Sequence, residues 1–151
     1  MIALAAAWLL ALSPLDQAAP CRGCSKTVVR DDKRDLLVFM SSSVPLETWK
    51  DFSRQMEKTG GVFVLGGIPG GSFEAFALKV LELRQAGIAA PIDIDPDLFE
   101  EFKVAEVPTV VLRGKKFDRT VGNLRLSAAL ELMAESGDEK DHASKLSLRL
   151  K

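Results

Sequence analysis

The chain has 151 residues, 47% of them hydrophobic, and its 20 Lys and Arg are balanced by 21 Asp and Glu. This length fits one domain with terminal segments, and a near-zero net charge lacks the basic field that holds nucleic acid. One histidine and no tyrosine leave little for acid–base catalysis at neutral pH.

The N-terminal segment, residues 1–20, is predicted to be a signal peptide. Residues 2–12 are almost wholly apolar. This run is shorter than the roughly 20 residues of a membrane span and matches the hydrophobic region of an export signal. Ala18 and Ala19 offer small residues for cleavage. No Lys or Arg precedes the run, so a buried helix of a cytosolic fold remains the alternative.

Residues 21–35 are predicted to form a polar linker that carries both cysteines of the chain, Cys21 and Cys24. The C-x-x-C spacing is shared by redox pairs and by half of a zinc site. Zinc takes four ligands, and the distant His142 cannot complete the set, so we expect no metal site. A redox-active pair, an inert local disulfide and thiols paired with a partner chain remain open. The charged stretch that follows the pair argues against catalysis.

The body of the chain is predicted to open with a buried strand over residues 36–40, because this run is apolar and without polar interruption. Residues 41–45 form a turn, and an amphipathic helix follows to about residue 56. We expect Ser43 to cap this helix and Pro45 to lie in its first turn. In open α/β sheets, ligands bind beyond the carboxyl ends of strands. This turn offers hydroxyls and a proline, but no thiol, carboxylate, histidine or lysine.

A second strand and helix are predicted next, at residues 62–65 and at residues 72–85. The glycine-rich residues 66–71 between them match neither common phosphate-binding pattern, so we interpret them as a flexible turn. Ser72 is the expected cap of the second helix. Its apolar side is predicted to hold Phe73, Phe76, Ala77, Val80 and Leu81 or Leu83.

The last part of the domain is predicted to contain three strands and two helices. A short strand at residues 92–94 precedes a short helix at residues 98–102, which Asp95 caps. The carboxylates around Asp95 lack the pattern of a calcium loop, so capping explains them better than a cation site. The remaining elements are a strand led by Pro108 within the stretch 104–112, a hairpin strand at 117–121 and a helix at about 124–135.

Residues 136–151 are predicted to be a charged C-terminal tail, either frayed or ordered by a partner, with His142 exposed to solvent. The preceding elements alternate as strand–helix–strand–helix and end in a hairpin and a helix. This order predicts an α/β domain over residues 36–135, with a mixed central sheet of about four to five strands flanked by helices.

This order of elements resembles the thioredoxin fold. Val107-Pro108-Thr109 is similar to the cis-proline segment of that fold, and residues 41–45 occupy the place of its redox C-x-x-C loop. The chain also resembles the F-type TrbC family of conjugative-transfer pilus assembly proteins. The segments that carry this second resemblance are residues 37–45, 65–73, 94–99 and 104–110.

The resemblance implies a periplasmic, non-catalytic component of a conjugative type IV secretion system, which acts with TraW-like partners and needs no cofactor. It implies no nucleic acid and no small-molecule substrate, and membrane contact only through the signal segment. In the thioredoxin fold the two loops lie side by side. They would form a groove for an extended partner segment, made of Ser41, Ser42, Ser43, Val44, Val107 and Pro108, with a cis peptide expected at Pro108.

Two enzymatic interpretations remain beside this one. The first is a periplasmic thiol–disulfide oxidoreductase or isomerase that uses Cys21 and Cys24. The second is a peroxidase-like or transferase branch of the same fold that uses the hydroxyl of Ser43. No base lies near Ser43 in the sequence, so the second has the weaker support.

Overall fold

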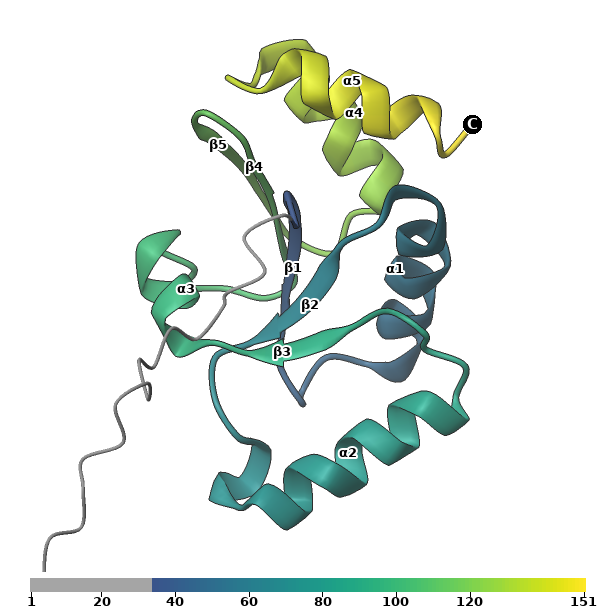
Figure 1. Cartoon of the computed structure of the whole chain (residues 1–151), viewed down its shortest axis with the longest axis vertical. Coiled ribbons are helices and arrows are strands. Elements are labelled where there is room, and N and C mark those ends of the chain that lie inside the picture. Colours follow the sequence, from purple (N-terminus) through teal and green to yellow (C-terminus); the bar gives the residue numbers. More distant parts are fainter. Residues whose placement is uncertain (1–33) are drawn as a thin grey trace, which may run out of the picture. The chain divides into compact units, whose positions relative to one another are not determined.

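The computed structural model describes residues 34–151 (Figure 1). The predicted signal peptide and the two cysteines lie outside the described residues. The first half contains β1 (Leu36–Met40), α1 (Leu46–Thr59), β2 (Val62–Leu65), the short 3-10 helix η1 (Pro69–Gly71) and α2 (Phe73–Gln85). The second half contains β3 (Ile92–Ile94), α3 (Pro96–Glu101), β4 (Thr109–Arg113), β5 (Phe117–Val121), α4 (Leu126–Ser136) and α5 (Lys140–Leu148).

The five strands form one mixed sheet in the order β3-β2-β1-β4-β5. β1 and β3 both pair parallel with β2, whereas β4 pairs antiparallel with β1 and β5 antiparallel with β4. The predicted α/β architecture with a mixed central sheet is therefore confirmed. The more specific likeness to the thioredoxin fold remains a prediction.

Side-chain alternation along β1 divides the core into two clusters. Leu36, Val38 and Met40 point to a larger cluster that includes side chains of α1, α4 and α5. Leu37 and Phe39 point to a smaller cluster on the other face, where α3 covers the sheet (Figure 1). All five residues of β1 are buried, as expected for a central strand with helices on both faces.

The first helix begins later than predicted, and its expected cap is wrong. α1 starts at Leu46 with Pro45 as its N-cap residue and no side-chain cap. The carbonyl of Pro45 accepts hydrogen bonds from Thr48 N at 3.0 Å and from Trp49 N at 3.4 Å. A proline keeps the residue before it out of the helical region. Val44 therefore cannot be the first helical residue, and Ser43 cannot cap.

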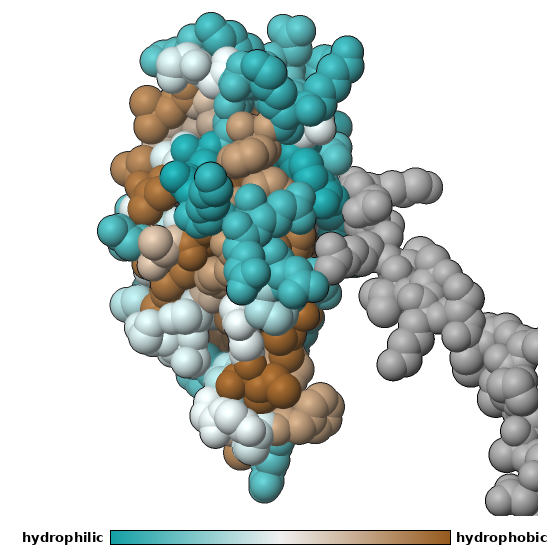
Figure 2. All heavy atoms as spheres, turned by 90° about the vertical axis from the view of Figure 1, so that its left-hand side faces the viewer, coloured by the Kyte–Doolittle hydropathy of each residue, from teal (hydrophilic) through white to brown (hydrophobic). Residues whose placement is uncertain are grey.

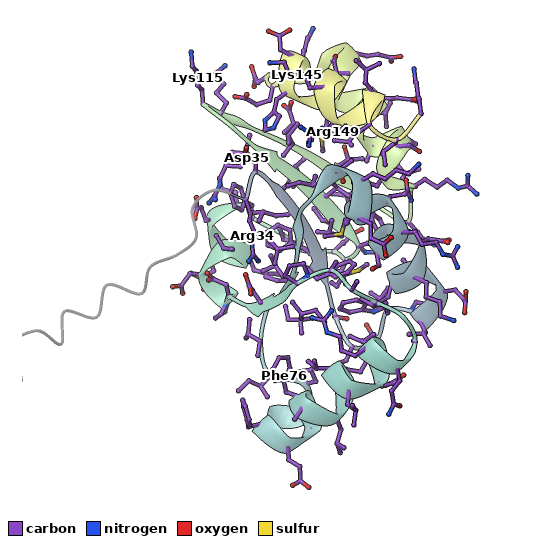
Figure 3. The ribbon with its side chains drawn as sticks, turned by 45° about the vertical axis from the view of Figure 1, so that its right-hand side comes forward. Arg34, Asp35, Phe76, Lys115, Lys145 and Arg149 are labelled. Carbon is purple, nitrogen blue, oxygen red and sulfur yellow. The ribbon has the colours of Figure 1, made fainter. Side chains whose placement is uncertain are left out.

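The caps of α2 and α3 are confirmed, but the apolar side of α2 is only partly right. Ser72 Oγ accepts from Ala75 N at 3.1 Å, and Asp95 Oδ1 accepts from Leu98 N at 3.2 Å. Leu83 is the one buried residue of α2, and Phe76 lies half-buried on the side facing the sheet (Figure 3). Phe73 and Ala77, which we expect on the apolar side, are exposed. Of the alternatives Leu81 and Leu83, only Leu83 is buried.

The expectation of a frayed or partner-ordered tail is wrong for residues 140–148, which form α5. Ala143 is fully buried and Leu146 is 5% exposed, and both belong to the larger core cluster. His142 is half-buried, with Nε2 at 3.6 Å from Asp35 Oδ2. A short stripe of small and apolar side chains at three-residue spacing is enough to pack this otherwise polar helix.

A carboxylate of β5 ties the β4–β5 hairpin to the connection between α4 and α5. Asp118 accepts from Asp138 N at 2.7 Å and from Glu139 N at 2.8 Å. Glu139 in turn accepts from Lys116 N at 2.7 Å. A hydrogen bond to Asp138 raises the pKa of the exposed Lys116 ammonium above its ordinary value. These contacts tie the start of α5 to the β4–β5 hairpin.

We expect Asp118→Ala to lower the free energy of unfolding by about 1–3 kcal/mol, because two backbone amides lose a partly desolvated carboxylate partner. Asp118→Asn keeps one acceptor and should lose less. Urea unfolding of both variants, followed by circular dichroism, measures the difference. Equal stability of Asp118→Ala and the parent chain would show that water replaces these bonds at no cost.

Candidate partner-binding site

The turn after β1 is held by its own serine hydroxyls. Ser41 Oγ accepts from Ser43 N at 3.2 Å, and the two hydroxyls are hydrogen-bonded to each other. Val44 N donates to Ser41 O at 3.1 Å. Such hydroxyl turns are typical of serine-rich connections. Val44 is 7% exposed and anchors the turn in the larger core cluster, while Ser42 and Ser43 are exposed.

The segment that leads into β4 is fixed on both sides of Pro108. The Val107–Pro108 peptide bond is cis, the geometry that the resemblance implied. Thr109 is buried, and its hydroxyl donates to Glu106 O at 2.6 Å. The carbonyl of Pro108 accepts from Gly122 N at 2.9 Å, just after β5. Val107 is half-buried and packs against both core clusters.

Strand pairing brings these two segments together. Phe39 of β1 faces Thr109 of β4 in an antiparallel register. The turn that follows β1 therefore begins beside the residues that precede β4. We call Ser41–Val44 together with Val107 and Pro108 the Ser41/Pro108 surface. Ser42 and Ser43 are its exposed part, Ser41 and Val107 are half-buried, and Val44 and Pro108 are buried. Only Ser42 and Ser43 of the six residues predicted to form a groove are therefore exposed.

The chemistry of the Ser41/Pro108 surface is that of hydroxyls and backbone groups. The Ser41 and Ser43 hydroxyls share one hydrogen bond. No general base is among the six residues of this surface, so none of them can activate a serine as a nucleophile. The nearest ion pair along the chain is Glu47–Lys50 in the first turn of α1, at 2.9 Å. The hydrogen bond from Lys50 lowers the pKa of Glu47. The six residues of the Ser41/Pro108 surface supply hydroxyls and backbone groups, but no thiol, carboxylate, histidine or lysine.

Neither a metal centre nor a membrane span is found in the part of the chain that the structure describes. No three Asp, Glu or His side chains within residues 34–151 gather closely enough to hold a metal ion. Asp95 instead caps α3, as noted above. None of the helices in this range combines the length and apolar character needed to cross a bilayer.

Sequence reasoning missed an apolar patch on η1 and α2, beyond the end of the sheet where β1 and β2 finish (Figure 1). Ile68, Phe73, Leu78 and Leu81 are 44%, 74%, 61% and 53% exposed. Brown side chains gather at the corresponding lower end of the molecule in Figure 2. The signal was present in the sequence, since α2 carries apolar residues on more than one face and only one face can be buried.

Comparison with known proteins shows what this chain is similar to. A family model described as "Type-F conjugative transfer system pilin assembly protein" matches residues 38–139. The "Periplasmic protein TrbC" of Escherichia coli (strain K12) is 33% identical over 107 residues, which are 70% of this chain and 50% of that protein. The chain therefore spans about half the length of this relative. No solved structure gave a significant match.

The matched region begins within β1 and ends just before α5, so it contains the whole sheet except Leu36 and Leu37, together with the Ser41/Pro108 surface. It covers well over half of the chain. The chain therefore belongs to the family of type-F conjugative transfer system pilin assembly proteins.

Proposed function

We propose that this chain is a non-catalytic periplasmic assembly protein of a conjugative type IV secretion system, which promotes pilus assembly by binding partner proteins. Family membership supports the assembly role, and the similarity to the periplasmic protein TrbC of Escherichia coli supports the compartment. The N-terminal apolar segment would serve as the export signal. TraW-like assembly proteins are the proposed partners.

The observation that carries this proposal is the pairing of Phe39 with Thr109, which sets a turn without a reactive group beside the Pro108 segment. In the thioredoxin fold, which the order of elements resembles, the redox C-x-x-C loop occupies the position of this turn. Here it offers exposed hydroxyls and backbone groups at Ser42 and Ser43. An extended segment of a partner can pair with such groups through main-chain hydrogen bonds, and neighbouring side chains then give specificity.

We expect Val107→Asp to reduce capture of a co-expressed TraW-like assembly protein at least about tenfold, because a carboxylate in a half-buried contact must be desolvated on binding. The measurement is a pull-down with the tagged full chain. Val121→Asp is the matched control, since Val121 of β5 is 44% exposed and outside the surface.

A loss of folding would imitate a loss of binding, so Ser42→Arg provides a second test. Ser42 is exposed, and a bulky side chain there should block a partner without disturbing the core. Thermal unfolding of each variant shows whether it is folded. Full capture by two folded variants, Val107→Asp and Ser42→Arg, would rule out this surface as the partner site.

A further inference from the structure

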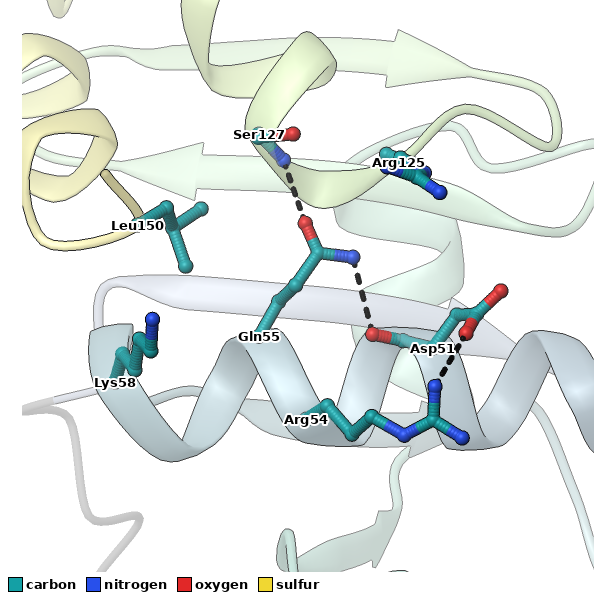
Figure 4. A pocket seen from close by; sticks show the side chains of 7 residues that line it. All are labelled: Asp51, Arg54, Gln55, Lys58, Arg125, Ser127 and Leu150. Carbon is teal, nitrogen blue, oxygen red and sulfur yellow. Dashed lines mark hydrogen bonds and ion pairs between the residues drawn. The ribbon is translucent and has the colours of Figure 1, made fainter.

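A second candidate contact site lies between α1 and the start of α4, where a pocket of about 360 Å³ opens to solvent (Figure 4). Three cations line it: Arg54 and Lys58 from α1 and Arg125 from the residue before α4. Asp51 is its one carboxylate, and Leu150 adds an apolar wall. None of these residues belongs to the Ser41/Pro108 surface.

The pocket has more positive than negative charge. Arg54 is paired with Asp51, with Nη1 at 3.2 Å from Oδ1. Within the described part of the chain, no ion pair engages Lys58 or Arg125. These two residues lie on either side of Gln55 in the close view (Figure 4). Two cations, one in α1 and one at the residue before α4, thus remain available to an anion.

A hydrogen-bonded bridge holds the two sides of the pocket in place. Gln55 Oε1 accepts from Ser127 N at 3.0 Å, and Gln55 Nε2 donates to Asp51 O at 3.0 Å. α4 has no side-chain cap and no acidic residue in its first turn. The partial positive charge of its N-terminus therefore adds to the field of the three cations. The hydrogen bond between Gln55 and Ser127 therefore ties the helix that carries Lys58 to the segment that carries Arg125.

We propose that this pocket binds an acidic peptide segment of a protein partner, with Lys58 and Arg125 pairing with its carboxylates and Leu150 contacting an apolar side chain. The guanidinium fork of Arg125 suits a carboxylate. The chain as a whole has a net charge of −1, which disfavours an extended polyanion such as nucleic acid or an anionic membrane. A short acidic segment would contact only the positively charged residues of this pocket and not the acidic residues elsewhere on the chain. This site goes beyond the proposed function, because it assigns a second contact on other elements.

The test measures binding of a fluorescein-labelled peptide, Glu-Glu-Leu-Glu-Glu, to the full chain at low ionic strength. The amide peptide Gln-Gln-Leu-Gln-Gln serves as the uncharged probe. We expect binding of the acidic peptide alone, and a loss of about tenfold or more in the double variant Lys58→Glu with Arg125→Glu. The double variant Lys115→Glu with Lys140→Glu changes net charge equally at exposed positions outside the pocket and should lose much less.

Lys58→Gln with Arg125→Gln avoids an acid at the C-terminal end of α1 and should give an intermediate loss. Equal losses in the two Glu double variants would overturn the proposal, because binding would then follow net charge alone. Binding of inorganic phosphate or of phosphatidylglycerol vesicles without binding of the acidic peptide would also overturn it. Unchanged peptide binding by Val107→Asp would support a site independent of the Ser41/Pro108 surface, whichever way the partner-capture test ends.

Discussion

Trp49→Ala should lower the free energy of unfolding by about 3–5 kcal/mol, the largest effect we expect from a single core substitution. Trp49 is 1% exposed, and its ring centroid lies 4.8 Å from that of Phe63. Both side chains belong to the larger core cluster between the sheet and α1. Removing the indole would leave a cavity that a close-packed interior fills only in part.

Trp49→Phe is the matched variant, and we expect it to be much less destabilising. The indole Nε1 of Trp49 is buried and has no hydrogen-bond partner within residues 34–151. A buried donor in that state costs about 1–3 kcal/mol, so a phenyl ring removes this cost while keeping most of the packing. Urea unfolding followed by circular dichroism compares the two variants. If Trp49→Phe destabilised the chain as much as Trp49→Ala, the indole N–H of Trp49 would have to be hydrogen-bonded in solution, which would contradict this interpretation.

Ala143→Asp should also destabilise strongly, by about 3 kcal/mol or more, because an unpaired carboxylate would enter the contact between α5 and the core. Ala143 is fully buried in the larger cluster. The neighbouring Ser144 is exposed, so Ser144→Asp places the same charge on the solvent side of the same helix and should change stability little.

These two α5 variants test whether the last helix is part of the folded domain. Thermal unfolding of the full chain measures both, and removal of residues 140–151 should destabilise in the same direction as Ala143→Asp. Equal stability of Ala143→Asp and Ser144→Asp would mean that residues 140–148 do not pack on α4 in solution. The original expectation of a frayed tail would then be correct.

The strands β1 and β2 could be predicted from the sequence because they are short apolar runs between clear breaks. Residues 36–40 and 62–65 have no polar interruption, so their burial follows from composition. The caps at Ser72 and Asp95 were equally local, since each hydroxyl or carboxylate bonds an amide three residues ahead. Signals of this kind need no knowledge of tertiary structure.

The failures have a different physical origin. α5 was missed because its buried positions include Ala143 and Ser147, which are small and carry little hydropathy. Its packing depends on α4 and on the Asp118 contacts with Asp138 and Glu139, twenty or more residues away. The inward side of α2 was misjudged because Phe73 and Leu81 are as apolar as the buried Leu83.

The candidate sites show the same limit. Ser41–Val44 could be singled out because the turn follows a buried strand, and Pro108 because it leads a β-branched strand. The basic pocket could not be predicted, since the bond from Ser127 to Gln55 joins residues 72 positions apart. Lys58 and Arg125 are ordinary surface cations in the sequence, and only the packing of α4 against α1 brings them to one pocket.

The most direct measurement is a count of pili on cells that carry this chain as their sole source of the protein. We expect cells with Cys21→Ser and Cys24→Ser to keep parental numbers of pili, while cells with Val107→Asp lose most of them although the variant is folded and exported. Loss of pili in the cysteine variant, with normal numbers for Val107→Asp, would contradict a docking role and point to thiol chemistry.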